Sequence, residues 1–238
     1  MEWAIEREDE GLLLIAISQG EDSVRIPVGS PPQHPLAAAA DRGWIQGVEL
    51  LASACRPWEL PKGGDTPLGL AAIQGHANCA AFLARWSDPD EANDAGQNAL
   101  LRAASRAKAD SVRALTAICS HAPDNHGSTP LMAAANVGGL ECVEALLPWS
   151  DIQAADRNGR SALALACIRG HEAVAMRLLA VDGSVFPGAF SADPAAMARM
   201  GHHPELARRI DAKILSESQR RQLEDGVRAA PSRRPPGL

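Results

Sequence analysis

Aromatic side chains are scarce in this 238-residue chain: five Trp, three Phe and no Tyr make up 3% of it. Alanine and leucine fill the apolar positions instead, as close packing of helices requires. Apolar residues still make up 46% of the chain and charged residues 22%, which is typical of a folded protein and excludes a disordered one. The chain is therefore long enough to bury a sizeable interior built largely from small side chains.

Positive charge is also limited. The chain has 23 Lys and Arg against 29 Asp and Glu, which gives a net charge of −6. General nucleic-acid binding requires a basic surface that displaces counterions, so this balance argues against a nucleic-acid partner. Only three of the 23 basic residues are lysines, and arginine is the better residue for bidentate contacts to carboxylates. The excess of Arg and Ala equally fits a GC-rich, bacterial genome, and the sequence leaves both causes open.

Targeting and membrane signals are missing too. Residues 1–10 are acidic and lack the apolar segment of a secretory signal, and no apolar run approaches the roughly 20 residues that span a bilayer. The five cysteines are odd in number and form no Cys-x-x-Cys motif. This favours free buried thiols in a reducing compartment over a disulfide framework. We therefore expect a soluble, cytoplasmic protein without a membrane partner.

Motifs that carry catalysis or bind cofactors are absent as well. The sequence has no Gly-rich phosphate loop, no Gly-x-Ser-x-Gly and no His-Glu-x-x-His. His202, His203 and Glu205 are close in sequence, but adjacent residues of a helix point apart and no third ligand has suitable spacing. The acidic run at 88–91 lacks the alternating ligands of a calcium loop. The sequence therefore predicts no catalytic residue, no metal and no cofactor.

What the chain does contain is a repeat of about 32 residues. Its markers are leucines separated by 32, 32, 31 and 32 residues: Leu36, Leu68, Leu100, Leu131 and Leu163. The second repeat reads Thr-Pro-Leu, then Ala-Ala, then Gly-His over residues 66–76, and the other repeats keep this order with substitutions. A fixed period of this size indicates stacked supersecondary units that bury their apolar faces against one another.

These elements, Thr-Pro-Leu, Ala-Ala and Gly-His, resemble the ankyrin-repeat family over roughly residues 30–210. The resemblance implies an all-α solenoid of stacked helix-turn-helix units with projecting turns, and a protein that binds other proteins. It also implies that His76 and His171, in the Gly-His element, bond to neighbouring backbone. Trp86 and Trp149 share one repeat position, in Trp-Ser-Asp endings that replace the family's commoner Gly-Ala-Asp. This shared position predicts that the two tryptophans pack in the same way.

Each repeat is expected to begin with a helix that runs from the Thr-Pro-Leu element to the glycine. Thr66 and Thr129 suit the N-cap, and the prolines after them suit the first turn, where a missing N–H costs nothing. Glycines such as Gly75 then end the helix by adopting a positive φ. The third repeat has Ala-Lys at residues 107–108 where Gly-His is expected. This substitution predicts a looser or shifted turn.

The flanking segments are expected to be degenerate caps. Residues 11–28 fit either a short helix or a hairpin, and the open helical face of the first repeat favours the helix. Ser216-Glu217-Ser218-Gln219 resembles a capping box that opens a helix reaching about Arg228. The expected division is an N-terminal cap at 1–29, five repeats at 30–192, a degenerate sixth repeat with a capping helix at 193–229, and a disordered tail at 230–238.

Two sets of positions line the concave face in this architecture, namely the residues after the paired alanines and the turn tips. The second residue after the alanines reads Arg, Gln, Arg, Val, Arg along the stack. Such a column predicts a partner with Asp or Glu, and solvated charges in an Arg-rich proteome fit it equally. Trp58 either anchors a partner or packs under its own loop. The binding candidates are Arg42, Trp58, Gln74, Arg106, His126, Asn136, Arg157, Asn158, Arg160 and Arg169.

The sequence therefore predicts non-enzymatic protein–protein recognition by a monomeric chain, through its concave face and turn tips. Two other functions remain open. One is an immunity or antitoxin-like inhibitor that plugs the active site of a cognate bacterial enzyme, which a neighbouring toxin gene would favour. The other is a secreted bacterial effector that binds host proteins, which a C-terminal export signal would favour.

Overall fold

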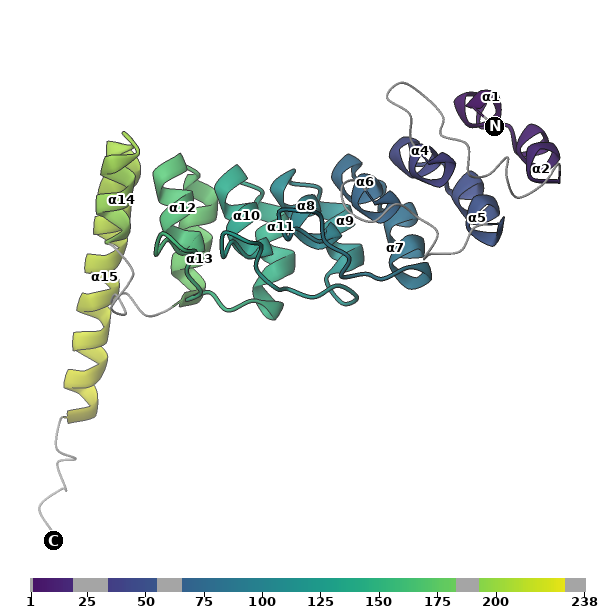
Figure 1. Ribbon diagram of the computed structural model, residues 1–238. Coiled ribbons are helices and arrows are strands. Elements are labelled where there is room, and N and C mark those ends of the chain that lie inside the picture. The colour runs from purple at the N-terminus through teal and green to yellow at the C-terminus, as the bar shows by residue number, and fades with distance from the viewer. Residues whose placement is uncertain (1, 19–33, 55–65, 183–192, 230–238) are drawn as a thin grey trace, which may run out of the picture.

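The computed structural model describes residues 2–18, 34–54, 66–182 and 193–229, and over these ranges the protein is a row of stacked helix pairs (Figure 1). The first helices of successive pairs are α4 (Pro35–Arg42), α6 (Pro67–Gln74), α8 (Ala99–Ser105), α10 (Pro130–Val137), α12 (Ala162–Arg169) and α14 (Pro194–Met200). The second helices are α5 (Ile45–Ala54), α7 (Ala77–Trp86), α9 (Ala109–Leu115), α11 (Leu140–Leu146), α13 (Glu172–Asp182) and α15 (Pro204–Ala229). Each first helix packs against the first helix of the next pair. The predicted all-α solenoid is confirmed.

The first helices of the second and fourth repeats begin and end as the sequence predicts. Thr66 Oγ1 accepts a hydrogen bond from the Gly69 N–H at 3.0 Å, and Thr129 Oγ1 accepts one from the Met132 N–H at 3.3 Å. These bonds satisfy N–H groups that cannot pair within the helix. Gly75 ends α6 with a φ of 94°, in the left-handed region that glycine adopts without strain. The chain turns there and enters α7.

The marker leucines lie in one continuous core. Their exposed fractions along the stack are 0%, 3%, 0%, 1% and 8%, for Leu36, Leu68, Leu100, Leu131 and Leu163. The paired alanines that follow them have 0% exposed surface in each of the first four repeats. Their small side chains let neighbouring first helices approach closely. Burial is therefore shared between adjacent repeats, which is the pattern of a solenoid and not of a single-centred core.

The turn of the third repeat keeps the regular closing bond, although α8 ends at Ser105, one residue earlier than the matching first helices end. Ala107 adopts a φ of 54°, in the left-handed region that glycine occupies elsewhere in the stack. The Lys108 N–H donates to the Ala103 carbonyl at 3.0 Å, just as the His76 N–H donates to the Ala71 carbonyl at 2.9 Å. A non-glycine residue bears a cost of roughly 1–2 kcal/mol in this conformation. Packing between repeats therefore imposes the turn on a residue that does not favour it.

The residue after the turn glycine packs against the turn of the preceding repeat. The histidine rings of the second and fifth repeats lie so close that a Cβ at Gly43 or Gly138 would come within 2.4 Å of His76 or 2.5 Å of His171. Each ring also bonds to the preceding repeat through Nε2, at 3.0 Å to the Asp41 carbonyl and at 3.1 Å to the Asn136 carbonyl. The role that the family resemblance implies for these histidines is confirmed.

The fourth repeat replaces this histidine with glycine. A Cβ at Gly139 would lie 3.1 Å from the Cβ of Ala107, so the alanine methyl already occupies part of the space that a ring fills elsewhere. The alanine in the third turn and the glycine in the fourth therefore compensate for each other. This coupling involves two repeats, so it cannot be recognised from the sequence of either repeat alone.

Both ends of the stack carry additional helices. Helices α1 (Glu2–Arg7) and α2 (Glu10–Ser18) pack against α4 and α5 respectively, and Leu13 of α2 has no exposed surface. The helical interpretation is confirmed for residues 11–18, and residues 19–28 lie outside the described ranges.

The C-terminal helix is longer than the sequence suggests. Helix α15 runs without interruption over 26 residues and extends beyond the stack (Figure 1). The predicted capping box at Ser216 therefore opens no new helix. Ser216 Oγ instead donates to the Lys213 carbonyl at 2.8 Å, a bond that a serine inside a helix makes. Across the described ranges, no helix combines the length and hydrophobicity needed to cross a membrane.

Candidate partner-binding groove

A hollow of about 300 Å³ lies between the first helices and the projecting turns of the third to fifth repeats. Helices α8, α10 and α12 form one wall, and the turns that precede these three helices form the other. The polar side chains that line it include Asp124, His126, Asn136, Asp156, Arg160 and Arg169. We refer to this hollow as the concave groove. It brings together four of the candidate residues predicted from the sequence.

The predicted column after the paired alanines faces outward. Its members, Arg42, Gln74, Arg106, Val137 and Arg169, are all exposed. Two of them bond to a residue of the preceding repeat. Gln74 Nε2 donates to Asp41 Oδ1 at 2.8 Å, and Arg169 Nε donates to Asn136 Oδ1 at 3.1 Å. The register proposed from the sequence thus agrees with the placement of these side chains.

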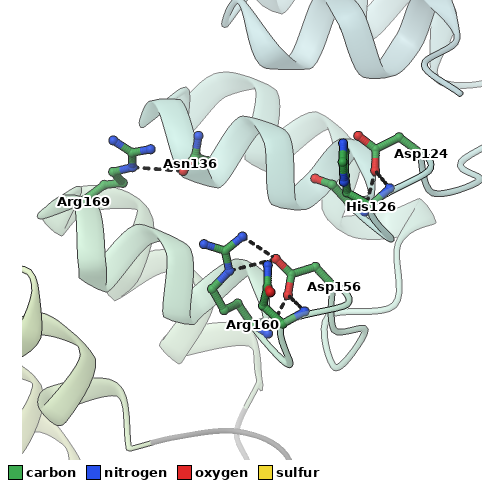
Figure 2. Close-up of polar contacts among 8 residues, drawn as sticks. Asp124, His126, Asn136, Asp156, Arg160 and Arg169 are labelled. Atoms are coloured by element: carbon green, nitrogen blue, oxygen red, sulfur yellow. Dashed lines mark hydrogen bonds and ion pairs between the residues drawn. The ribbon is translucent and has the colours of Figure 1, made fainter. Parts of the chain in front are cut away.

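The arginines of the column are not equivalent. The Asn136 bond holds the Arg169 guanidinium through its Nε (Figure 2). At the corresponding place before Arg106 stands Ile73, whose side chain has no acceptor. Arg169 is therefore pre-oriented by its own protein, whereas Arg106 lacks this support.

Asx side chains hold the projecting turns. Asp124 Oδ1 accepts hydrogen bonds from the His126 and Ser128 N–H groups, both at 2.9 Å. In the next repeat, Asp156 Oδ1 likewise accepts hydrogen bonds from the N–H groups two and four residues ahead, again at 2.9 Å. Neighbouring turns are joined by backbone, since the Arg157 N–H donates to the His126 carbonyl at 3.0 Å. One wall of the groove is therefore a connected row of rigid turns.

The fifth turn contains an internal ion pair that the sequence analysis did not identify. Arg160 Nε and Nη2 donate to Asp156 Oδ2 at 2.8 and 2.7 Å (Figure 2). The Asp156 side chain is 4% exposed and that of Arg160 is 44% exposed. Burial alone would raise the pKa of the Asp156 carboxyl, but the hydrogen bonds from Arg160 and from the turn backbone outweigh it and hold the pKa below its ordinary value. The charge of Arg160 is thus largely compensated within the chain.

The remaining candidates fall into two groups. His126, Arg157 and Asn158 are exposed at the turn tips, where only their backbone groups contribute to the turn bonds described above. Trp58 lies outside the described residues. Sequence reasoning singled out Arg160 but missed its partner, although an aspartate and an arginine four residues apart in one turn was the available signal.

The two tryptophans that share a repeat position do not pack alike, so that prediction is wrong. Trp86 is partly buried against the core, whereas Trp149 is 57% exposed and stacks on the His121 ring with centroids 6.3 Å apart. Helix α7 continues as far as Trp86, but α11 ends at Leu146 and a 3-10 turn, η2 (Leu147–Trp149), follows. Pro148 has no N–H with which to continue the helix, and this displaces Trp149.

A larger hollow, of about 560 Å³, lies on the outer helices α5 and α7. Trp86 and Phe82 line it together with Ile45. None of the candidate residues that the structure describes lines it, and its described lining comes from two repeats, whereas three repeats contribute polar side chains to the concave groove. We therefore place the candidate site in the smaller, more polar groove.

The cysteines are buried in the part of the chain that the structure describes. Its four cysteines, Cys79, Cys119, Cys142 and Cys167, are free and buried. Burial raises the pKa of Cys79 to about 11 and that of Cys167 to about 12, so these thiols stay protonated and unreactive near neutral pH. Over the same ranges, no three His, Cys, Asp or Glu side chains lie close enough to hold a metal ion.

A comparison with known families bears on this arrangement. Residues 81–156 and 100–187 match the family described as ankyrin repeats (3 copies). The matched stretch contains helices α8 to α13, the turns held by Asp124 and Asp156, and every residue named above as lining the concave groove.

Proposed function

This chain belongs to the ankyrin-repeat family, and we propose that it binds a partner protein through the concave groove and the adjoining turn tips, without catalysing a reaction. Ankyrin repeats are generally protein–protein interaction modules. One observation carries the proposal for this chain: a hollow to which three successive repeats contribute polar side chains, several of them held in place by bonds within the chain. Pre-oriented groups of this kind lose little side-chain freedom when a partner binds.

The partner is proposed to present Asp or Glu to the outward column. Arg42, Arg106 and Arg169 are exposed in the first, third and fifth repeats, and Arg169 is held through its Nε, which leaves its two Nη groups to a partner. Two parallel N–H groups match the geometry of a carboxylate. Charged contacts of this type chiefly accelerate association and select the partner.

The protein is further proposed to act in a reducing compartment, the cytoplasm. Free, buried cysteines with raised pKa values support this proposal, because none of those described is paired in a disulfide.

Affinity capture from the source cells, followed by hydrogen exchange on the purified complex, tests the proposed surface. We expect slower exchange in the turns at 93–98, 124–129 and 156–161, with little change in α9, α11 and α13. Protection confined to those outer helices would contradict the proposal. The captured protein also separates the open alternatives: an enzyme that loses activity on binding indicates an inhibitor, and a host protein indicates an effector.

A further inference from the structure

Three consecutive turns use the same Asx position but pair its second side-chain atom differently. Asn93 Nδ2 donates to Oε1 of Gln97, four residues ahead, at 3.4 Å. Asp156 Oδ2 accepts two N–H groups from Arg160, again four residues ahead. In each of these turns the chain itself supplies a long side chain that reaches the second atom.

The fourth turn lacks such a side chain. Ser128 stands four residues after Asp124, and its side chain is too short to reproduce the Arg160 contact. Within the described ranges, the side-chain partner of Asp124 Oδ2 is the neutral Gln97 amide of the preceding turn, at a long 3.4 Å. Asp124 is nevertheless 9% exposed. Buried carboxylates are normally paired with a cation or with several good donors, so this oxygen is poorly compensated.

Asp124 also borders the concave groove. Figure 2 shows its second oxygen turned away from the backbone bonds of its own turn, and the hollow of about 300 Å³ offers room for a side chain beside it. The chain has a net charge of −6, which favours the approach of a cation. The neighbouring turn shows which cation fits this turn geometry: a guanidinium that approaches the Asp oxygen through Nε and Nη2.

We propose that an arginine of the partner protein enters the concave groove and pairs with Asp124 Oδ2. It supplies from outside the cation that Arg160 supplies to Asp156 from within the chain. This inference rests on the proposed function and specifies the partner's chemistry. Together with the carboxylate expected at Arg169, it describes a partner segment that carries both an arginine and an acidic residue.

Nα-acetyl-arginine amide serves as the probe, titrated into the full-length protein labelled with ¹⁵N. We expect saturable shifts at millimolar concentration in the His126 and Ser128 amide signals, because both N–H groups donate to Asp124. Nα-acetyl-citrulline amide has the same shape without the charge and should leave these signals unchanged. Equal shifts with both probes, or no saturable shift with the arginine probe, would overturn the proposal.

Two variants sharpen the test. Ser128→Arg recreates the fifth turn in the fourth, so it should raise the melting temperature and abolish the probe shifts, whereas the neutral control Ser128→Gln should not raise it. Asp124→Asn should keep the turn, since Asn93 accepts the same two backbone bonds at 3.1 and 3.0 Å, yet it should lose the probe. Undiminished probe binding by either Ser128→Arg or Asp124→Asn would contradict the inference. The probe needs no partner, so its failure is distinct from a failure of the capture experiment.

Discussion

The fourth and fifth repeats have the same helical framework but differ in the turn that borders the concave groove and in the residue after the turn glycine. Leu131 and Leu163 occupy one core position, and both turns are held by an aspartate with 2.9 Å backbone bonds. The fifth repeat adds an arginine to its turn and a histidine after its glycine, where the fourth has serine and glycine. In the fifth repeat, the charge of Asp156 is therefore paired with an arginine of the same turn, whereas in the fourth repeat Oδ2 of Asp124 lies beside the groove without an equivalent partner.

The largest expected effect tests the shared framework. Leu131→Ala and Leu163→Ala should each lower the free energy of unfolding by about 2–5 kcal/mol, because both remove a buried side chain between repeats. The exposed fractions of 1% and 8% predict similar losses at the two positions. Urea denaturation followed by circular dichroism measures them. A loss under about 1 kcal/mol at Leu131 would place this residue outside the core and refute the equivalence of the two repeats.

The next effect concerns the residue after the turn glycine. Gly139→His introduces the ring that the fifth repeat has, but Ala107 already fills part of its space. The variant should lose about 1–3 kcal/mol through overpacking. Adding Ala107→Gly should recover most of this loss, because it removes both the methyl group and the strained left-handed alanine. A double-mutant cycle on unfolding free energies gives the coupling, and purely additive effects would rule out the compensation.

The smallest effect makes the fifth turn resemble the fourth. Arg160→Ser should cost up to about 1 kcal/mol at neutral pH, a modest loss because the arginine is 44% exposed and screened by solvent. The pKa of Asp156 is lowered in the folded state, so its pair stabilises the protein above the ordinary value of 3.8. That contribution disappears as pH falls through the lowered pKa. Unfolding curves of wild type and Arg160→Ser should therefore converge in acid, and a constant difference would show that the carboxylate charge is not involved.

The sequence predicted the repeat architecture because period, caps and turn glycines are local signals that recur in register. Thr66 and Gly75 illustrate this, since each acts on its own helix end. What it could not predict depends on contacts between repeats. Ala107 keeps the regular turn because Gly139, from the next repeat, makes room for its methyl group. Trp149 departs from Trp86 for a local reason instead, because the adjacent Pro148, which the sequence shows, ends the helix early.

The candidate site was predicted in the same uneven way. The exposure of Arg42, Arg106 and Arg169 follows from their position in the repeat together with the architecture that the family resemblance implies. The pairing of Arg160 with Asp156, and the lack of an equivalent partner for Asp124, depend on how turns of successive repeats lie against one another. A single sequence gives the positions of these side chains along the stack, but it does not show which of their charges are paired within the chain.

Binding of the captured partner to two charge-reversed variants tests the central claim, that the concave face binds a protein, most directly. One variant carries Arg42→Glu, Arg106→Glu and Arg169→Glu. The matched control carries Arg85→Glu, Arg113→Glu and Arg177→Glu on the second helices, with the same change in net charge. We expect the first variant to bind at least several-fold more weakly at low salt, mainly through slower association, and the control to bind nearly as wild type does. The difference should shrink at physiological ionic strength, where the Debye length is about 8 Å. Equal affinity of wild type and the concave-face variant, or an equal loss in both variants, would contradict the claim.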